Sequence, residues 1–259
     1  MLDALYRHRF QDEDLPRKRL IWEVICRDFL QKHVGPDAVV LDLACGYGEF
    51  INAIRAKVKH AADLNPESPR YLDPDVIFHA ASADRLDDIP SGTVDVVFAS
   101  NFLEHLPDKT ALSAVFNEVF RVLKPGGRFM VLGPNIRYLP GAYWDFYDHH
   151  LPLTHLSLAE GLAIHGFTVD LLIDRFLPYT TKSRLPAHPL LISLYLKIPA
   201  AWRLLGKQFF AVARKVAAAP TPRESAKMAS EKGPAVDDDS RQYVKIAREE
   251  RHDAVQVHS

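Results

Sequence analysis

Residues 39–50 read VVLDLACGYGEF, and this stretch decides the fold. The apolar run 38–43 is typical of a buried parallel strand. Gly46 and Gly48 follow it, and glycine lets the backbone take positive φ and approach a ligand closely. A helical stretch then runs from Glu49 to about Lys57, and its first turn presents free N–H groups. A strand, a glycine turn and a helix in this order predict a nucleotide-binding α/β sheet.

The spacing of the glycines separates two classes of nucleotide-binding protein. A dinucleotide fingerprint has the pattern GxGxxG, whose third glycine allows close packing of the phosphate-binding helix. Here position 44 is Ala and position 51 is Ile, so the pattern is ACGYGEF. The missing third glycine disfavours an NAD-dependent oxidoreductase, which stays the alternative enzyme class.

The rest of the chain alternates short apolar runs with amphipathic stretches. We expect strands at 58–63, 76–80, 93–99, 128–133, 167–174 and 208–214, and helices at 15–33, 108–123 and 157–165. This order predicts an α/β fold: a Rossmann-like, seven-stranded, mostly parallel sheet with helices on both faces. Residues 1–37 form an N-terminal helical cap, 38–215 one domain with a helical insertion at 175–207, and 216–259 a polar, disordered tail.

Composition and charge narrow the function further. The 259 residues are 47% hydrophobic and 25% charged, the balance of a globular protein, and the net charge of -1 gives no basic face for nucleic acid. Cys26 and Cys45 have no CxxC spacing, which disfavours a zinc site or a disulfide scaffold and fits a reducing compartment. No signal peptide or membrane span is readable, so we expect a cytoplasmic protein.

Polar residues follow the predicted strands where ligands bind in open α/β sheets. Asp63 ends the second strand, 15 residues after Gly48; Asp84 follows the third, and residues 99–106, ASNFLEHL, follow the fourth. An acid after the second strand accepts hydrogen bonds from ribose hydroxyls in such sheets. The alternatives are a helix N-cap for Asp63 and a turn acid for Asp84.

Five segments together carry a family resemblance: LDLACGYG, AADLNPE, ASADRLDDIP, VDVVFASNFLEHL and EVFRVLKPGGRFMVLGPN. In this order and spacing they resemble class I S-adenosylmethionine (SAM)-dependent methyltransferases, closest to the type 11 branch, over about residues 38–215. The resemblance implies SAM as cofactor, with the loop 42–48 at its methionine end, Asp63 at the ribose, Asp84 at the adenine and Asn101 beside the sulfonium. The cofactor-binding residues predicted are Asp42, Ala44, Gly46, Gly48, Asp63, Leu64, Asp84 and Asn101. Ala44 departs from the glycine that the family often has there.

The acceptor is expected to lie under the segment after the fifth strand. Positions 138–155 hold three histidines, two acids and five aromatics. Histidine suits the base that takes a proton from a hydroxyl acceptor, so the catalytic candidates are His149, His150 and His155. The alternative is a packed loop whose histidines cap backbone groups. No metal is predicted, since these histidines with Asp148 match no tight ligand spacing. His105 is expected to be a packed histidine below the site, and the direction of Glu104 is left open.

The predicted function is methyl transfer from SAM to a small-molecule, sugar or glycan/glycolipid acceptor, preferentially at oxygen. The long aromatic–histidine loop resembles that of methyltransferases of sugar or polysaccharide pathways. No Asn/Asp-Pro-Pro-aromatic tetrapeptide follows the fourth strand, which disfavours methylation of planar amines. A non-catalytic, methyltransferase-like binding subunit is the third alternative. The insertion 175–207 is read as a lid, a dimer interface or, through 189–207, a peripheral contact with the inner face of a membrane. The oligomeric state is left undecided.

Overall fold

The computed structural model describes residues 15–179 and 188–216, which form one seven-stranded sheet. Its strands are β1 Val39–Leu43, β2 Val58–Asp63, β3 Val76–Ala80, β4 Val94–Ser100, β5 Leu123–Pro134, β6 Phe167–Ile173 and β7 Gln208–Lys215. Their order is β3-β2-β1-β4-β5-β7-β6. Neighbours among β1–β5 pair in parallel, and β7 pairs antiparallel with both β5 and β6. The predicted mostly parallel, seven-stranded sheet is confirmed.

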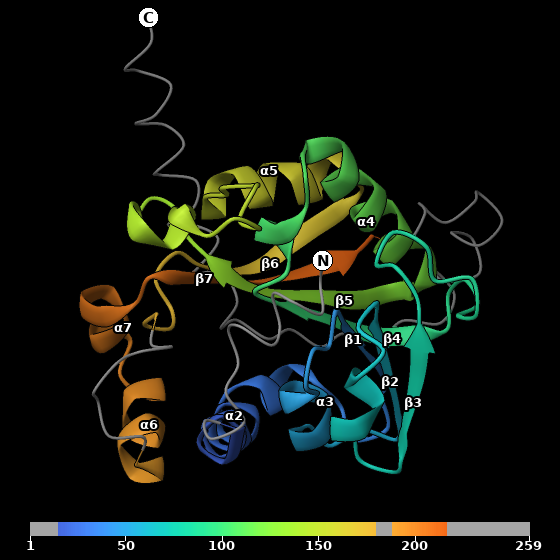
Figure 1. Ribbon diagram of the computed structural model, residues 1–259, viewed down its shortest axis with the longest axis horizontal. Helices are drawn as coiled ribbons and strands as arrows, with labels where there is room; N and C mark the ends of the chain where they lie inside the picture. Colours follow the sequence, from blue (N-terminus) through green and yellow to red (C-terminus); the bar gives the residue numbers. More distant parts are fainter. Residues whose placement is uncertain (1–14, 180–187, 217–259) are drawn as a thin grey trace, which may run out of the picture.

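Helices cover both faces of the sheet (Figure 1). Helices α4 Lys109–Val122 and α5 His155–Ile164 lie on one face, and α2 Leu15–Asp28 and α3 Glu49–Ala53 lie on the other. The strands alternate between the two layers: Phe129 and Val131 of β5 pack under α4 and α5, while Met130 and Leu132 pack under α2. This alternation follows from the two-residue side-chain period of a strand.

The predicted helical insertion precedes the last strand as two short helices. These are α6 Pro189–Leu196 and α7 Pro199–Leu205, each with proline in its first turn, where the missing N–H has no intrahelical partner to lose. No helix in the described ranges is long and apolar enough to cross a membrane. The predicted disordered tail lies outside the described residues from position 217 on, as do residues 1–14 of the predicted N-terminal cap.

Three helix boundaries differ from those expected by two residues or more. The helix predicted to reach Lys57 ends at Ala53, because the Lys57 N–H donates to the Ala38 carbonyl (3.0 Å) and draws the chain beside β1. Helix α5 begins at His155 rather than at 157, since Thr154 and Ser157 form a capping box. Helix α2 ends at Asp28, and a 3-10 helix, η2 Leu30–His33, continues it.

Candidate active site

The glycine turn after β1 is held by a carboxylate from β2. Asp63 Oδ2 accepts a hydrogen bond from the Gly46 N–H, and Oδ1 accepts one from the Asn65 N–H, both at 2.8 Å. The Cys45 N–H donates to the Ala62 carbonyl at 3.1 Å, so the turn is tied to β2 by its backbone as well. Asp63 therefore braces the turn between the carboxyl ends of two adjacent parallel strands, and the structure does not use it as a helix N-cap.

Positive φ angles shape this turn. Gly46 and Gly48 have φ of 54° and 72°, and Ala44, where the family often has glycine, has φ of 57°. A Cβ built on Gly46 meets nothing within 4 Å, so the backbone there faces open space. The turn thus leaves its backbone accessible at the edge of the sheet where ligands of such folds bind.

Asp42 supports the helix that follows the turn. It is buried, and the backbone N–H of Ile51, in the first turn of α3, lies near enough to favour its ionised form. Gly48, the N-cap of α3, has no side chain to satisfy such a donor. Burial raises the pKa of the Asp42 carboxyl well above its usual value, and the charges of Glu49 and Asp63 add to the rise.

The other predicted cofactor residues follow carboxyl ends of the same sheet. Asn101 comes directly after β4 and has a φ of 48°. Its backbone N–H donates to the Leu132 carbonyl (2.9 Å), and the residue is exposed at the edge of the sheet. Leu64, directly after Asp63, is 60% exposed, a high value for leucine. Asp84 is exposed and accepts a short hydrogen bond from Ser82 Oγ.

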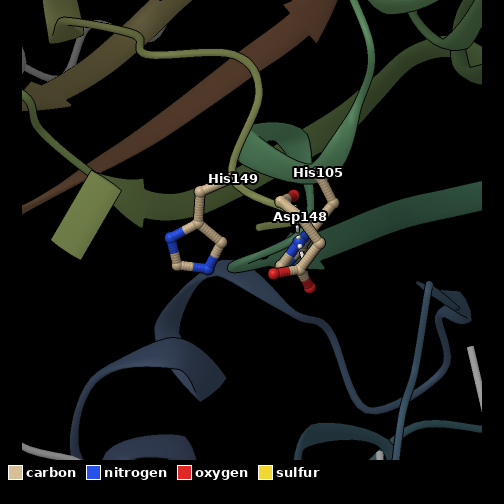
Figure 2. A group of neighbouring side chains, drawn as sticks. All are labelled: His105, Asp148 and His149. Carbon is tan, nitrogen blue, oxygen red and sulfur yellow. Dashed lines mark hydrogen bonds and ion pairs between the residues drawn. The ribbon is translucent and has the colours of Figure 1, made fainter. Parts of the chain in front are cut away.

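A cluster of two histidines and an aspartate lies beside this edge (Figure 2). His105 comes from the 3-10 helix after β4, η4 Leu103–His105, and Asp148 and His149 come from the loop after β5. His105 Nδ1 lies 3.0 Å from the carbonyl oxygen and 3.2 Å from Oδ2 of Asp148, and the rings of His105 and His149 are 4.9 Å apart, edge to face. Their ligand-type atoms all lie within 4.8 Å of one another, so the same group could also hold a cation.

A hydrogen bond to one carbonyl group defines the tautomer of His149. Its Nδ1 lies 2.7 Å from the carbonyl oxygen of Tyr143. Because a carbonyl oxygen only accepts, Nδ1 must carry the proton, and the lone pair of the neutral ring is on Nε2. The ring of Tyr143 packs against the His149 ring at 4.3 Å between centroids. His149 is thus oriented from two sides with one nitrogen able to accept a proton.

Glu104 anchors the loop that carries this cluster. Its carboxylate is buried, and Oε1 accepts a hydrogen bond from the Tyr143 hydroxyl at 2.7 Å. Its carbonyl accepts from the N–H groups of His150 (2.8 Å) and Leu151 (3.0 Å). Burial raises the pKa of Glu104, partly offset by the nearby His105 and the Tyr143 hydrogen bond. Glu104 therefore points into the protein, toward the loop after β5, and not to solvent.

The three predicted histidines are not brought together. His149 joins the cluster, whereas His150 is exposed next to it. His155 is buried as the first residue of α5, and its Nδ1 lies 2.9 Å from Asn135 Nδ2. His105, expected to be a packed histidine below the site, is hydrogen-bonded to the Asp148 carbonyl and lies against His149. Sequence reasoning missed the joint role of Glu104, His105 and Tyr143, for which the only local signal was their place after β4 and β5.

Comparison with known proteins shows what the first part of the sheet is similar to. The family model described as "Methyltransferase domain" matches residues 41–131, from β1 into β5. The chain is 31% identical to Methyltransferase AacuQ of Aspergillus aculeatus over 39% of this chain and 34% of that protein. It is 30% identical to a Mycolicibacterium smegmatis protein named "Probable S-adenosylmethionine-dependent methyltransferase", over 57% of this chain and 58% of that protein. The chain thus spans about a third of the first of these curated relatives and somewhat over half of the second.

A solved structure shares the fold. In the complex between the Haloferax volcanii Trm112 methyltransferase activator and a methyltransferase, the matching chain superposes with a TM-score of 0.60 at 18% identity, over 80% of this chain and 95% of that one. The sheet order differs from the 3-2-1-4-5-6 order of dinucleotide-binding sheets by its antiparallel β7. From β1 into β5, the chain is therefore similar to the methyltransferase domain family and to a protein named as SAM-dependent.

Proposed function

We propose that this chain transfers the methyl group of SAM to an oxygen atom of a small-molecule acceptor, of which a sugar or a glycolipid glycan is our preferred class. The observation that carries the proposal is the orientation of His149. Its Nδ1–H is bonded to the Tyr143 carbonyl, and it lies beside His105 and Asp148 in the loop after β5. Asn101 and the turn braced by Asp63 follow strands of the same sheet edge.

The edge of the sheet suits an adenosyl ligand. Gly46 leaves open space against its backbone, and the exposed Leu64 offers an apolar surface next to Asp63. The Asp63 oxygens each accept one backbone hydrogen bond, and a carboxylate oxygen has lone pairs for a second donor such as a ribose hydroxyl. SAM, when bound there, would supply a sulfonium methyl group: the acceptor oxygen would bond to the methyl carbon as the C–S bond breaks, which gives a methyl ether and S-adenosylhomocysteine.

The residues of this chain handle the proton of the acceptor hydroxyl. His149 Nε2 takes that proton as the oxygen forms its bond to the methyl carbon, and the resulting imidazolium lies near the Asp148 carboxylate. His105 donates its Nδ1–H to the backbone carbonyl of Asp148, and the same nitrogen lies 3.2 Å from the Asp148 carboxylate. His149 later releases the proton to solvent. Glu104 and Tyr143 position the loop and are not in the path of the proton.

Binding of SAM is the first test of this function. Asp63→Ala removes the brace of the Gly46 turn and the partner for ribose, so SAM affinity is expected to fall by about a hundredfold, since each lost charged hydrogen bond costs about 1.5–3 kcal/mol. Isothermal titration calorimetry measures it. Asp75→Asn, at an exposed position before β3 on the opposite edge, is the matched control and should bind as the wild type does. Normal affinity in Asp63→Ala would refute the assigned site.

The role of His149 is tested by methyl transfer itself. With methyl-labelled SAM and a panel of sugar and phenolic acceptors, His149→Gln is expected to reduce kcat on the best acceptor by about a hundredfold or more and to leave SAM affinity unchanged. His150→Gln changes the exposed neighbour and should keep the wild-type rate. An unaltered rate in His149→Gln contradicts a base at this position. A rate abolished by EDTA assigns the cluster to a cation instead, and SAM binding without transfer to any acceptor favours a non-catalytic subunit.

A further inference from the structure

Helices α6 and α7 present an unusual apolar surface. Six of their leucine and isoleucine side chains, from 40% to 76% exposed, point away from the protein: Leu190, Leu191, Leu194, Ile198, Leu204 and Leu205. We call this the α6–α7 surface. A group of exposed large apolar residues on neighbouring short helices is typical of an interaction site, because scattered single residues are the norm elsewhere.

The opposite side of the two helices is firmly packed. Leu196 is buried, and Tyr195 and Trp202 contact the core under α2. The Tyr195 hydroxyl donates to the Phe176 carbonyl (2.5 Å), and the Trp202 indole N–H donates to the Tyr195 carbonyl (2.8 Å). The two helices are therefore held in one orientation, with one side packed on the core and the leucines of the other side exposed.

The segment around this surface is positively charged. Residues 175–207 contain six lysines and arginines and no aspartate or glutamate. Lys197, Arg203 and Lys207 are exposed within and directly after the two helices. Asp28 of α2 is a nearby acid, and its carboxylate is already paired with Arg27 (2.7 Å). Apolar side chains flanked by bases, in a segment that itself contains no acid, complement an anionic membrane, whose interface takes up leucines while basic side chains meet the headgroups.

We propose that the α6–α7 surface docks this protein on the surface of an anionic phospholipid bilayer. A second copy of the chain is a poorer occupant, because a two-fold contact would bring the same basic residues of both copies together. With eight and seven residues, the helices are suited to lying in the interface and not to spanning the bilayer.

The surface flanks the edge of the sheet that carries the candidate site. Helix α7 leads into β7, whose first residue, Gln208, pairs with Pro134 at the carboxyl end of β5 (Figure 1). The loop with His149 leaves β5 from the same end. If the proposed function holds, a docked protein faces acceptors anchored in the membrane, although docking itself requires neither SAM nor methyl transfer.

Vesicle sedimentation with the full chain tests the docking. The protein is expected to bind vesicles of phosphatidylcholine mixed with phosphatidylglycerol, and to bind pure phosphatidylcholine vesicles about tenfold more weakly. Leu190→Ser/Leu204→Ser removes two highly exposed leucines, and Arg203→Gln/Lys207→Gln removes two bases. Each pair should reduce binding to the mixed vesicles by about tenfold.

Matched controls place the same changes elsewhere. Ile164→Ser alters an equally exposed side chain on α5, and Arg55→Gln/Lys57→Gln removes two exposed bases before β2; both should bind vesicles as the wild type does. Wild-type protein that stays in the supernatant with mixed vesicles overturns the proposal. So does equal loss of binding in variants and controls, or a wild-type dimer that Leu190→Ser/Leu204→Ser converts to monomer. Calorimetric SAM binding is independent of all these outcomes.

Discussion

Gly48 shows how one backbone torsion supports the site. It is the N-cap of α3 at φ 72°, and a Cβ at this position would lie inside contact distance of Leu72 Cδ2 and close to the Asn52 amide. Asn52 in turn donates to the Tyr71 carbonyl (2.8 Å) and accepts from the Asp73 N–H (3.0 Å). Glycine at 48 therefore allows both the left-handed turn and the approach of the segment after β2.

We predict that Gly48→Ala destabilises the protein by about 2–3 kcal/mol, from the strain of positive φ and from displacement of Leu72. Urea unfolding measures the change. Gly126→Ala is the control: its φ is 77°, but a Cβ there meets nothing within 4 Å, so only strain of about 1 kcal/mol is expected. Equal losses in the two variants would show that the contact with Leu72 is unimportant.

At the scale of elements, β2 and β3 are joined by a histidine pair as well as by their ladder. His60 Nδ1 lies 2.9 Å from His79 Nε2, and both rings are half-buried. A hydrogen bond between two imidazoles needs a neutral ring as acceptor. Burial lowers the pKa of both histidines; the charge of His79 lowers that of His60 further, and Asp88 partly offsets the fall for His79.

Acid is therefore expected to weaken this edge of the sheet. Because the folded-state pKa values lie below the unfolded value of about 6.5, the unfolded chain binds more protons once the pH falls through that value. The stability that the neutral histidine pair contributes is complete above the unfolded-state pKa. It is lost as the pH falls below that value toward the folded-state pKa values. The melting temperature of the wild type should fall more steeply between neutral and mildly acidic pH than that of His79→Gln. His150→Gln, on an exposed loop, should follow the wild type; parallel curves for all three contradict the prediction.

At the scale of the whole molecule, Phe29, directly after α2, helps to close the second face of the sheet. Its ring lies 4.3 Å from that of Phe176, 5.2 Å from Phe210 of β7 and 5.8 Å from Trp202 of α7. These three partners come from three separate parts of the chain: the segment after β6, β7 and α7. One side chain thus joins the N-terminal helix, the last strand and the insertion that carries the α6–α7 surface.

Phe29→Ala is predicted to destabilise the protein by about 3–5 kcal/mol, since it leaves a cavity among aromatic rings that cannot collapse freely. Leu20→Ala, on the exposed side of α2, should cost far less. Urea unfolding of both variants measures this difference. The Phe29 variant should also lose vesicle binding in proportion to its unfolded fraction. A loss below about 1 kcal/mol for Phe29→Ala would show that α2 contributes little to the fold.

Local patterns determined the sheet and the glycine turn. Apolar runs or alternating apolar positions predicted all seven strands, since strands buried on both faces, such as β1, β4 and β7, require continuous runs. Gly46, Gly48 and Asp63 were found from their spacing after β1 and β2. Helix ends were predicted less well: α3 stops at Ala53 because a backbone hydrogen bond to Ala38, distant in sequence, competes with the helix.

Only the tertiary structure separates the three predicted histidines from one another. The spacing of His149, His150 and His155 made them equivalent, yet one joins a cluster, one is exposed and one is buried. The difference arises from contacts across 39 and 43 residues, between Tyr143 and Glu104 and between Asp148 and His105. Such contacts depend on two loops leaving neighbouring strands at the same edge, and no local periodicity encodes where their side chains meet.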